Sequence, residues 1–282
     1  SEFLQVTLLA IIQGIAEFLP ISSSGHLVVL GKLFEQWFGD PAEDPRQNLV
    51  LNVTLHVGTL AAILVVYWRD LWGIWRRPKL CLAIILATLP AAIVGVVLKK
   101  YIEATFEMPI VVACGWLVTA SLLWYGQRSE HDARPLSELT WRDALLIGAF
   151  QAVSALFRGV SRSGSTIAGG LFSGLSREAA AAFSFLIAIP VVAGAAILEG
   201  RPLLKAWWTG QGAEAGSLLG GYSPQALLLG WLISFLVGWV SLRWLIKFIV
   251  RRGLHVFVYY VLTVSVLTFL WQGYEFFWRS GG

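Results

Sequence analysis

Apolar residues lie along this chain in long stretches separated by short polar segments. Six of these stretches approach the roughly 20 residues that an α-helix needs to cross a bilayer. They cover residues 49–68, 80–98, 109–126, 179–198, 225–246 and 256–278. Pro90 and Pro190 fall inside two of them, which membrane helices tolerate where neighbouring helices bond the freed carbonyl. The pattern therefore predicts six transmembrane helices.

Two further apolar segments are interrupted by polar turns. The first covers residues 3–21 and passes through Ser22, Ser23, Ser24 and Gly25 into the short apolar segment 27–34. The second covers residues 144–157 and passes through the polar segment 158–166 into the short apolar segment 167–175. Non-helical backbone at membrane depth needs protein or a water-filled cavity around it. Both segments are therefore predicted to be re-entrant helix hairpins, which enter and leave the membrane on one side.

The two hairpins resemble each other. Gln13 corresponds to Gln151, and the Ser-x-Ser-Gly pattern at 22–25 returns at 161–164. Three predicted spans follow each hairpin, so the second hairpin must enter from the opposite face. We therefore predict an all-α polytopic membrane protein, a single domain over residues 1–282 with an inverted repeat of about 3–127 and 141–278. The two polar turns can then meet near the middle of the membrane.

Composition agrees with a membrane protein. Hydrophobic residues make up 57% of the chain and charged residues 13%, with a mean hydropathy of +0.70, whereas soluble domains carry roughly 25% charged residues. These values exclude a plain cytosolic enzyme, a disordered protein and a disulfide-stapled secreted domain. The net charge is +4, but no cluster of basic residues lies apart from the apolar segments, so no nucleic-acid partner is expected. Cys81 and Cys114 show neither metal spacing nor a disulfide pattern.

Lys and Arg residues in the loops predict the orientation, because the face richer in them lies in the cytoplasm. One face carries the larger set: Arg69, Arg76, Arg77, Lys79, Arg128, Arg134, Arg142, Arg177, Lys247, Arg251 and Arg252. The other face carries Lys32, Arg46, Lys99, Lys100, Arg201, Lys205 and Arg279. We therefore expect both termini and the first hairpin to face outward. In a Gram-negative cell the chain would then be a multi-pass protein of the inner membrane, with its polar site open to the periplasm.

Ionisable residues inside the hairpins indicate chemistry, because a charge within the membrane costs at least ~2.5 kcal/mol. Glu17, His26, Arg158 and Arg162 are such residues. A Ser/Gly turn can direct backbone N–H groups at an anion, and a guanidinium can bind phosphate through two N–H groups. An imidazole can transfer a proton near neutral pH. A hydroxyl, an imidazole, a carboxylate and a guanidinium together suit phosphoryl transfer through a covalent serine intermediate.

Two stretches of sequence carry a family resemblance. The stretch from Gln13 to His26, QGIAEFLPISSSGH, resembles the first signature of the undecaprenyl-pyrophosphate phosphatases, the BacA-type bacitracin-resistance family. The stretch from Gly159 to Thr166, GVSRSGST, resembles the second signature. The resemblance implies hydrolysis of undecaprenyl pyrophosphate to undecaprenyl phosphate and inorganic phosphate. This reaction recycles the lipid carrier for peptidoglycan synthesis, and overproduction gives bacitracin resistance.

The resemblance also implies residue roles. Ser23 matches the nucleophile, His26 the proton-transfer partner, Glu17 the essential acid and Arg162 the phosphate-binding arginine. Family activity is linked to a divalent cation, Mg²⁺ or Ca²⁺, which Glu17 and Gln13 could hold. Substrate binding is expected at the two turns, through Gln13, Ser22, Ser24, Gly25, Arg158, Ser161, Ser163, Gly164 and Thr166. Arg158 departs from the family, which commonly has Pro before the glycine of the second signature.

Other interpretations of the same residues stay open at this stage. Glu17 and Arg162 could pair only to tie the hairpins together. The remaining hairpin serines are more typical of turns and N-caps than of catalysis: Ser22, Ser24, Ser161 and Ser163. Only the resemblance selects Ser23 over Ser24. His56, inside the segment 49–68, could line a cavity or bond to a neighbouring helix.

A second class of function fits the same architecture. Inverted repeats with paired hairpins are typical of transporters, so a polyprenyl-phosphate transporter or flippase is the alternative, alone or combined with hydrolysis. It needs no nucleophile, and it would release no phosphate. A scaffold protein explains the two matching hairpins poorly. The expected partners are undecaprenyl pyrophosphate, membrane lipid and a second copy of the chain, with Gly115, Gly230 and Gly238 available for close helix contacts.

Overall fold

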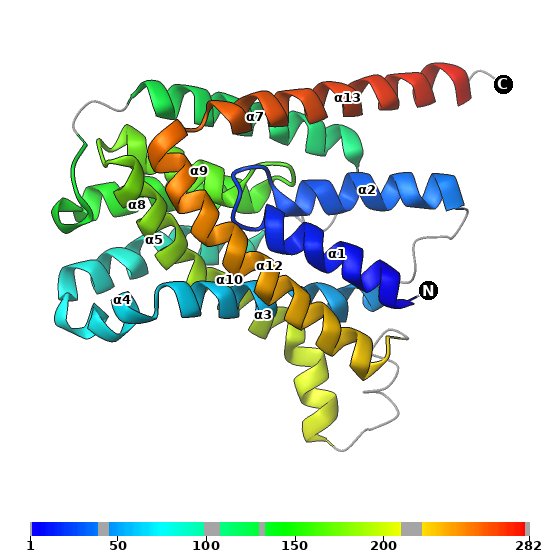
Figure 1. The fold of residues 1–282 in the computed structure, drawn as a ribbon, viewed down its shortest axis with the longest axis horizontal. Coiled ribbons are helices and arrows are strands. Elements are labelled where there is room, and N and C mark those ends of the chain that lie inside the picture. The colour runs from blue at the N-terminus through cyan, green and yellow to red at the C-terminus, as the bar shows by residue number, and fades with distance from the viewer. Residues whose placement is uncertain (1, 39–44, 99–107, 130–132, 210–221, 280–282) are drawn as a thin grey trace.

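The computed structural model describes residues 2–38, 45–98, 108–129, 133–209 and 222–279 (Figure 1). Within these residues the regular structure is helical, apart from an isolated β-bridge between Arg134 and Leu175. The helices are α1 (Glu2–Ala16), α2 (Ser23–Phe38), α3 (Pro45–Val66), α4 (Trp68–Gly73), η1 (Ile74–Arg76), α5 (Pro78–Val97), α7 (Pro109–Arg128), η2 (Leu136–Glu138), α8 (Trp141–Leu156), α9 (Arg162–Phe172), α10 (Arg177–Trp208), α12 (Pro224–Arg252) and α13 (His255–Arg279).

Five described helices are long and apolar enough to cross a membrane, namely α5, α7, α10, α12 and α13. They confirm long helices at the segments predicted from residues 80–98, 109–126, 179–198, 225–246 and 256–278. The segment predicted at 49–68 differs, because α3 ends at Val66 and the chain bends by 66° into α4. Counting that bent pair as one span gives up to six, so the chain is an all-α, multi-pass membrane protein.

Local sequence explains where several of these helices begin. Pro78, Pro109 and Pro224 stand in the first turn of α5, α7 and α12, where the missing proline N–H leaves no helical bond unmade. Thr140 starts α8 with a capping box completed by Asp143. These signals fix the starts of α8, in the second hairpin, and of the long helices α5, α7 and α12.

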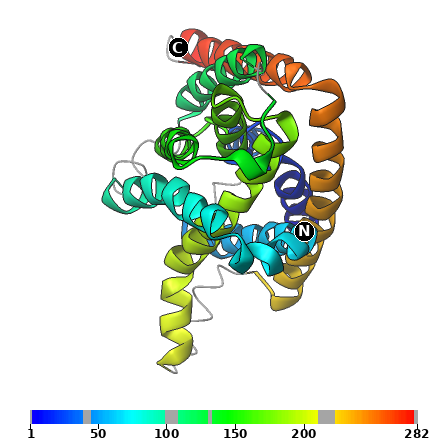
Figure 2. The same ribbon diagram turned by 90° about the vertical axis from the view of Figure 1, so that its left-hand side faces the viewer.

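Helix packing repeats itself between the two halves of the chain. The packing of α5 against α8 is matched by that of α12 against α1, which are the corresponding elements of the other half. Two further pairs join corresponding helices directly, α3 with α10 and α7 with α13. The α7–α13 pair runs along one edge of the molecule (Figure 1), and the end of α10 projects away from the body (Figure 2). The first helix of each hairpin, α1 or α8, packs on a helix of the other half, and the second helix, α2 or α9, contacts α7.

Glycines allow α7 to touch the second polar turn backbone to backbone. A Cβ added at Gly115 would lie 2.4 Å from the carbonyl oxygen of Arg158. Gly159 has a φ of +90°, and a Cβ there would lie 2.2 Å from the carbonyl oxygen of Val112. Gly230 and Gly238 likewise face residues of the same chain. Gly115, Gly230 and Gly238, which the sequence offers as helix-contact positions, therefore serve contacts within the protomer.

Replacing Gly115 by alanine is expected to destabilise the protein by about 2 kcal/mol, because overpacking a close backbone contact typically costs 1–3 kcal/mol. Gly95→Ala in α5 is the control, since a Cβ there would meet nothing within 4 Å and alanine favours the helix. Thermal unfolding of the detergent-purified variants measures both effects. Equal unfolding temperatures for Gly115→Ala and the unchanged protein would contradict the close contact.

Candidate active site

The two hairpins direct the N-termini of their second helices at each other. Helix α1 ends at Ala16, and a last turn is closed by the bond from the Glu17 N–H to the Gln13 carbonyl, at 2.9 Å. After Pro20 the chain reverses, and α2 begins at Ser23. In the second hairpin α8 ends at Leu156 and α9 begins at Arg162. Ser23 and Arg162 are therefore the first residues of corresponding helices, and α2 is longer than the segment 27–34 predicted from the apolar pattern.

The hairpin serines before these helices are N-caps. The hydroxyl of Ser22 accepts a bond from the Gly25 N–H at 3.3 Å, and that of Ser161 accepts one from the Gly164 N–H at 3.1 Å. The turns also match in their side-chain contacts. Ser22 Oγ lies 3.4 Å from Ser24 Oγ, and Ser161 Oγ lies 3.3 Å from Ser163 Oγ. The capping interpretation is thus confirmed for Ser22 and Ser161, and the repeat extends to hydrogen bonds.

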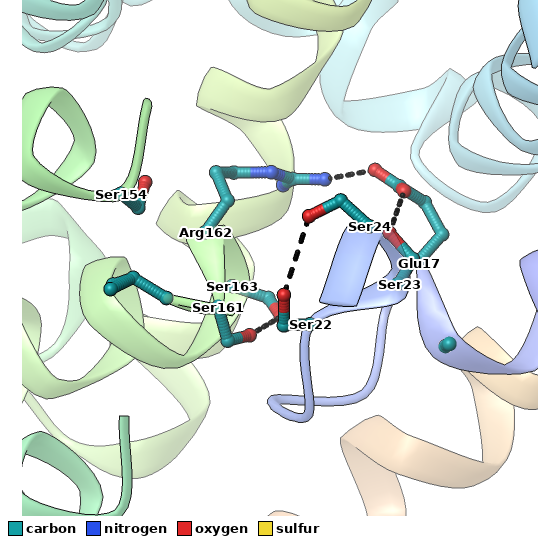
Figure 3. Close-up of a pocket in the computed structure, with 10 residues that line it drawn as sticks. Glu17, Ser22, Ser23, Ser24, Ser154, Ser161, Arg162 and Ser163 are labelled. Carbon is teal, nitrogen blue, oxygen red and sulfur yellow. Dashed lines mark hydrogen bonds and ion pairs between the residues drawn. The ribbon is translucent and has the colours of Figure 1, made fainter. Parts of the chain in front are cut away.

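A small polar pocket of about 90 Å³ lies where the hairpins meet (Figure 3). It is lined by Ala16, Glu17, Ser22, Ser23, Ser24, Ser154, Val160, Ser161, Arg162 and Ser163. Pockets that enclose whole drug-sized ligands measure 300–1,000 Å³. This pocket therefore suits the polar end of a ligand and not a long apolar tail.

Glu17 is the centre of the polar contacts in this pocket. Arg162 Nη2 donates to Glu17 Oε1 at 2.6 Å, and Ser23 Oγ donates to Glu17 Oε2 at 3.0 Å (Figure 3). Gln13 Nε2 donates to the same Oε2 at 3.1 Å. The Glu17 side chain is only 8% exposed, and a buried charge requires such partners. The structure therefore brings together Gln13, Glu17, Ser23 and Arg162, as the sequence predicted.

One nitrogen of the Arg162 guanidinium has no hydrogen-bond partner among the described residues. Its Nη2 bonds to Glu17, but its buried Nη1 has no hydrogen-bond partner in the described part of the chain. The first residues of α2 and α9 also line the pocket, namely Ser23 and Ser24 in α2 and Arg162 and Ser163 in α9, and the first N–H groups of a helix have no partner within the helix. Helix N-termini bind anions well. The pocket thus offers an anion a guanidinium and two helix ends, beside a hydroxyl bonded to a carboxylate.

His26 lies at the edge of this arrangement and does not bond to Ser23. Its Nδ1 lies 2.8 Å from the Ser22 carbonyl oxygen, and its Nε2 lies 2.8 Å from the Tyr260 hydroxyl on α13. Trp116 contacts the ring edge on, with ring centres 5.0 Å apart. Both ring nitrogens therefore have partners other than the hydroxyl that the resemblance assigns to them.

Several expected substrate contacts lie outside the pocket wall. Thr166 Oγ1 donates to the Arg162 carbonyl at 2.9 Å and lies 2.6 Å from Ser184 Oγ. Gly25 and Gly164 are positions of close packing, where an added Cβ would lie 3.0 Å from a Val112 methyl carbon and 3.1 Å from Ser161 Cβ. Arg158 does not line the pocket either, and its backbone packs on α7. These four residues support the turns. None of them lines the pocket, so the geometry does not support the prediction that they contact the substrate.

Comparison with known proteins assigns the family. Residues 6–267 match the family model described as bacitracin resistance protein BacA. The chain belongs to the BacA family. An undecaprenyl-diphosphatase of Rhodopirellula baltica is 38% identical over 271 residues, which cover 96% of this chain and 98% of that protein. Proteins with the same name from Alkaliphilus metalliredigens and Chromohalobacter salexigens are 37% and 35% identical, covering 94% and 96% of this chain and 97% and 99% of their own length.

In this BacA-family protein, residues outside the two signatures also build the site. His56 on α3 places Nε2 3.8 Å from Glu17 Oε2, although it is not among the residues that line the pocket. Thr119 on α7 accepts a bond from the Ser161 N–H at 2.9 Å and donates to the Gly159 carbonyl at 3.1 Å. His56 can be found from the sequence, because it is an ionisable residue in an apolar segment. Thr119 cannot, because a threonine in an apolar segment is not unusual.

Gln151, the counterpart of Gln13 in the second repeat, has a different place. Its Nε2 donates to the Ala87 carbonyl at 3.0 Å, in the part of α5 that is interrupted by Pro90. Ala155, and not an acid, stands where the repeat would place a second Glu17. The two hairpins therefore share their capping hydrogen bonds, while the first alone carries the carboxylate.

The residues present do not fit a divalent cation held by the protein. The pocket lining contains a single carboxylate, Glu17, and both of its oxygens already accept bonds from Arg162, Ser23 and Gln13. Mg²⁺ and Ca²⁺ prefer several oxygen ligands, and the adjacent guanidinium repels them. No group of three His, Cys, Asp or Glu suited to a metal occurs among the residues with described positions. The prediction that Glu17 and Gln13 hold the cation therefore finds no support in the donor set.

Proposed function

We propose that this chain is an integral-membrane phosphatase that hydrolyses undecaprenyl pyrophosphate to undecaprenyl phosphate and inorganic phosphate. Its place in the BacA family and its undecaprenyl-diphosphatase relatives support this proposal. The observation that carries it is the Ser23 hydroxyl bonded to Glu17, beside an arginine with a buried, unengaged N–H. The product would return as lipid carrier for peptidoglycan synthesis.

Only the diphosphate end of the substrate enters the pocket in this proposal. The terminal phosphate accepts bonds from Arg162 Nη1 and from the first N–H groups of α2 and α9. The undecaprenyl tail stays in the lipid, because the pocket of about 90 Å³ is polar and small. Any divalent cation that the reaction required would have to be held by the diphosphate, because Glu17 already accepts bonds from Arg162, Ser23 and Gln13.

The reaction then proceeds through a phosphoserine. Glu17 Oε2 accepts the proton of Ser23 Oγ, which attacks the terminal phosphorus, and the bond from that phosphorus to the bridging oxygen breaks. Undecaprenyl phosphate leaves with the bridging oxygen. The proton on Glu17 passes to this departing phosphate, which restores the Glu17 carboxylate. Glu17 then takes a proton from a water molecule, whose oxygen attacks the phosphorus of the phosphoserine. The bond from that phosphorus to Ser23 Oγ breaks, Ser23 Oγ takes the proton from Glu17, and inorganic phosphate leaves. Arg162 balances the negative charge that grows on the phosphoryl oxygens in both steps.

The hairpins are re-entrant in this proposal, and the two repeats are inverted in the bacterial cytoplasmic membrane. The matched helix pairs support the repeat, and the loop Lys and Arg residues support a pocket open to the periplasm. Single cysteines placed in the loops and labelled from each side of the membrane test this topology. Labelling of the loop between α7 and α8 from the periplasm would contradict it.

The detergent-purified protein is expected to release one phosphate for each undecaprenyl pyrophosphate consumed. A colorimetric phosphate assay with lipid analysis by chromatography measures both products. A chelator is expected to slow the reaction only by removing cations from the diphosphate of the substrate. Mg²⁺ or Ca²⁺ should therefore not raise the unfolding temperature of the protein when no substrate is present. Binding of the lipid with no phosphate release would favour a transporter or flippase.

A further inference from the structure

The proton positions on His26 follow from its partners. The Ser22 carbonyl oxygen can only accept a hydrogen bond, so Nδ1, 2.8 Å away, carries the hydrogen. In the neutral ring Nε2 then accepts the bond from the Tyr260 hydroxyl at 2.8 Å. The ring also stacks on Tyr260, with ring centres 5.7 Å apart and planes 10° from parallel. No lone pair of this imidazole is left to take the proton of Ser23.

The bond from His26 acts on the most strained residue of the first turn. Ser22 has a φ of +67°, a left-handed conformation that costs a non-glycine residue roughly 1–2 kcal/mol. The carbonyl of Ser22 also accepts the His26 N–H at 3.3 Å, and the preceding carbonyl, that of Ile21, accepts Trp116 Nε1 at 2.9 Å. Trp116 and His26 therefore hold the backbone just before Ser23.

The geometry points to a clamp in which Tyr260 positions Ser23 through His26. The Tyr260 hydroxyl fixes the His26 ring, the ring fixes the Ser22 carbonyl, and the Ser22 backbone directs Ser23 Oγ at Glu17 Oε2, 3.0 Å away. His26 acts in this clamp as a neutral link and not as the proton acceptor. This role rests on the proposed function, because it assumes that Ser23 is the nucleophile.

The clamp also joins the two halves of the chain. Tyr260 lies on α13, the last helix of the second repeat, whereas Ser22 and His26 belong to the first hairpin. α13 packs along α7, which supplies Trp116 as a second aromatic contact of the His26 ring. A displacement of α13 against α7 would therefore reach Ser23 through two hydrogen bonds. Tyr260 is accordingly a positioning residue and not a catalytic one.

Tyr260→Phe tests the clamp by removing only the hydroxyl, and Tyr259→Phe, the neighbouring tyrosine on α13, is the matched control. We expect Tyr260→Phe to lower kcat by about 3- to 10-fold with little change in KM, and Tyr259→Phe to match the unchanged protein. His26→Asn keeps a donor for the Ser22 carbonyl but cannot reach Tyr260. It should therefore lower kcat by about tenfold, and adding Tyr260→Phe should lower it no further.

A catalytic base at His26 predicts different results. His26→Asn would then lose about 10²- to 10⁴-fold in kcat, together with the acid limb of the pH–rate profile, and this outcome would overturn the clamp. A second readout needs no phosphatase activity. In Ser23→Cys protein, alkylation at position 23, followed by peptide mapping, should become severalfold faster with Tyr260→Phe and stay unchanged with Tyr259→Phe. Equal rates would overturn the clamp, whereas an inactive unchanged protein would overturn the proposed function alone.

Discussion

Ser23→Ala is expected to abolish phosphate release, with a fall in kcat of about 10⁴-fold or more, as loss of a nucleophile causes in other covalent mechanisms. Ser23 is the only hydroxyl in the described structure that bonds to Glu17, so no neighbouring serine can replace it without moving the turn. Steady-state assays with undecaprenyl pyrophosphate measure the loss. Rapid acid quenching with substrate labelled at the terminal phosphate should trap a phosphoserine in the unchanged protein and none in Ser23→Ala.

Ser24→Ala is the comparison for this experiment. Ser24 also lines the pocket, but its Oγ lies 3.4 Å from Ser22 Oγ and has no bond to Glu17. We expect a loss of less than about tenfold, since only a contact around the phosphate changes. Normal turnover by Ser23→Ala, or a larger loss with Ser24→Ala, would move the nucleophile to another residue and leave the family assignment in place.

The sequence predicts the helical segments well because each depends on a local apolar pattern. The prediction at residues 49–68 misses a bend of 66° between α3 and α4. A run of apolar residues shows that a segment lies in the membrane, but it does not show the direction that the chain takes at its end. The early start of α2 has another reason. Ser22 caps the helix from a left-handed conformation, and a pattern of polar residues alone is interpreted as a turn.

The candidate site is predictable to the extent that charge in an apolar segment is costly. Glu17 and Arg162 are found in this way, and the structure joins them at 2.6 Å although they are far apart in the chain. The surroundings of His26 are not predictable in this way, because its partner Tyr260 lies on the last helix and resembles other interfacial tyrosines. Contacts between distant helices depend on packing, which a single sequence does not display.

Arg162→Met is expected to lower both stability and activity. It leaves Glu17 buried without its cationic partner, which typically costs 3–5 kcal/mol, and it removes the unpartnered N–H group of an arginine that lines the pocket. Arg134→Met is the control, because Arg134 pairs with Asp143 at 3.2 Å outside the pocket. That variant should lose stability while the folded protein keeps its kcat. Thermal unfolding and phosphate release, measured on the same preparations, separate the two effects.

The double variant Glu17→Gln/Arg162→Met decides whether the pair is only a structural tie between the hairpins. With both charges removed, no charge is buried unpaired, and stability should recover most of what Arg162→Met loses. Activity should stay at least about 10³-fold below that of the unchanged protein, because neither the base for Ser23 nor the phosphate ligand returns. A double variant that regains turnover together with stability would assign the pair to folding. Recovery of stability without turnover means that the same contact both holds the hairpins together and aligns the carboxylate with Ser23, so that assembly of the fold also assembles the site.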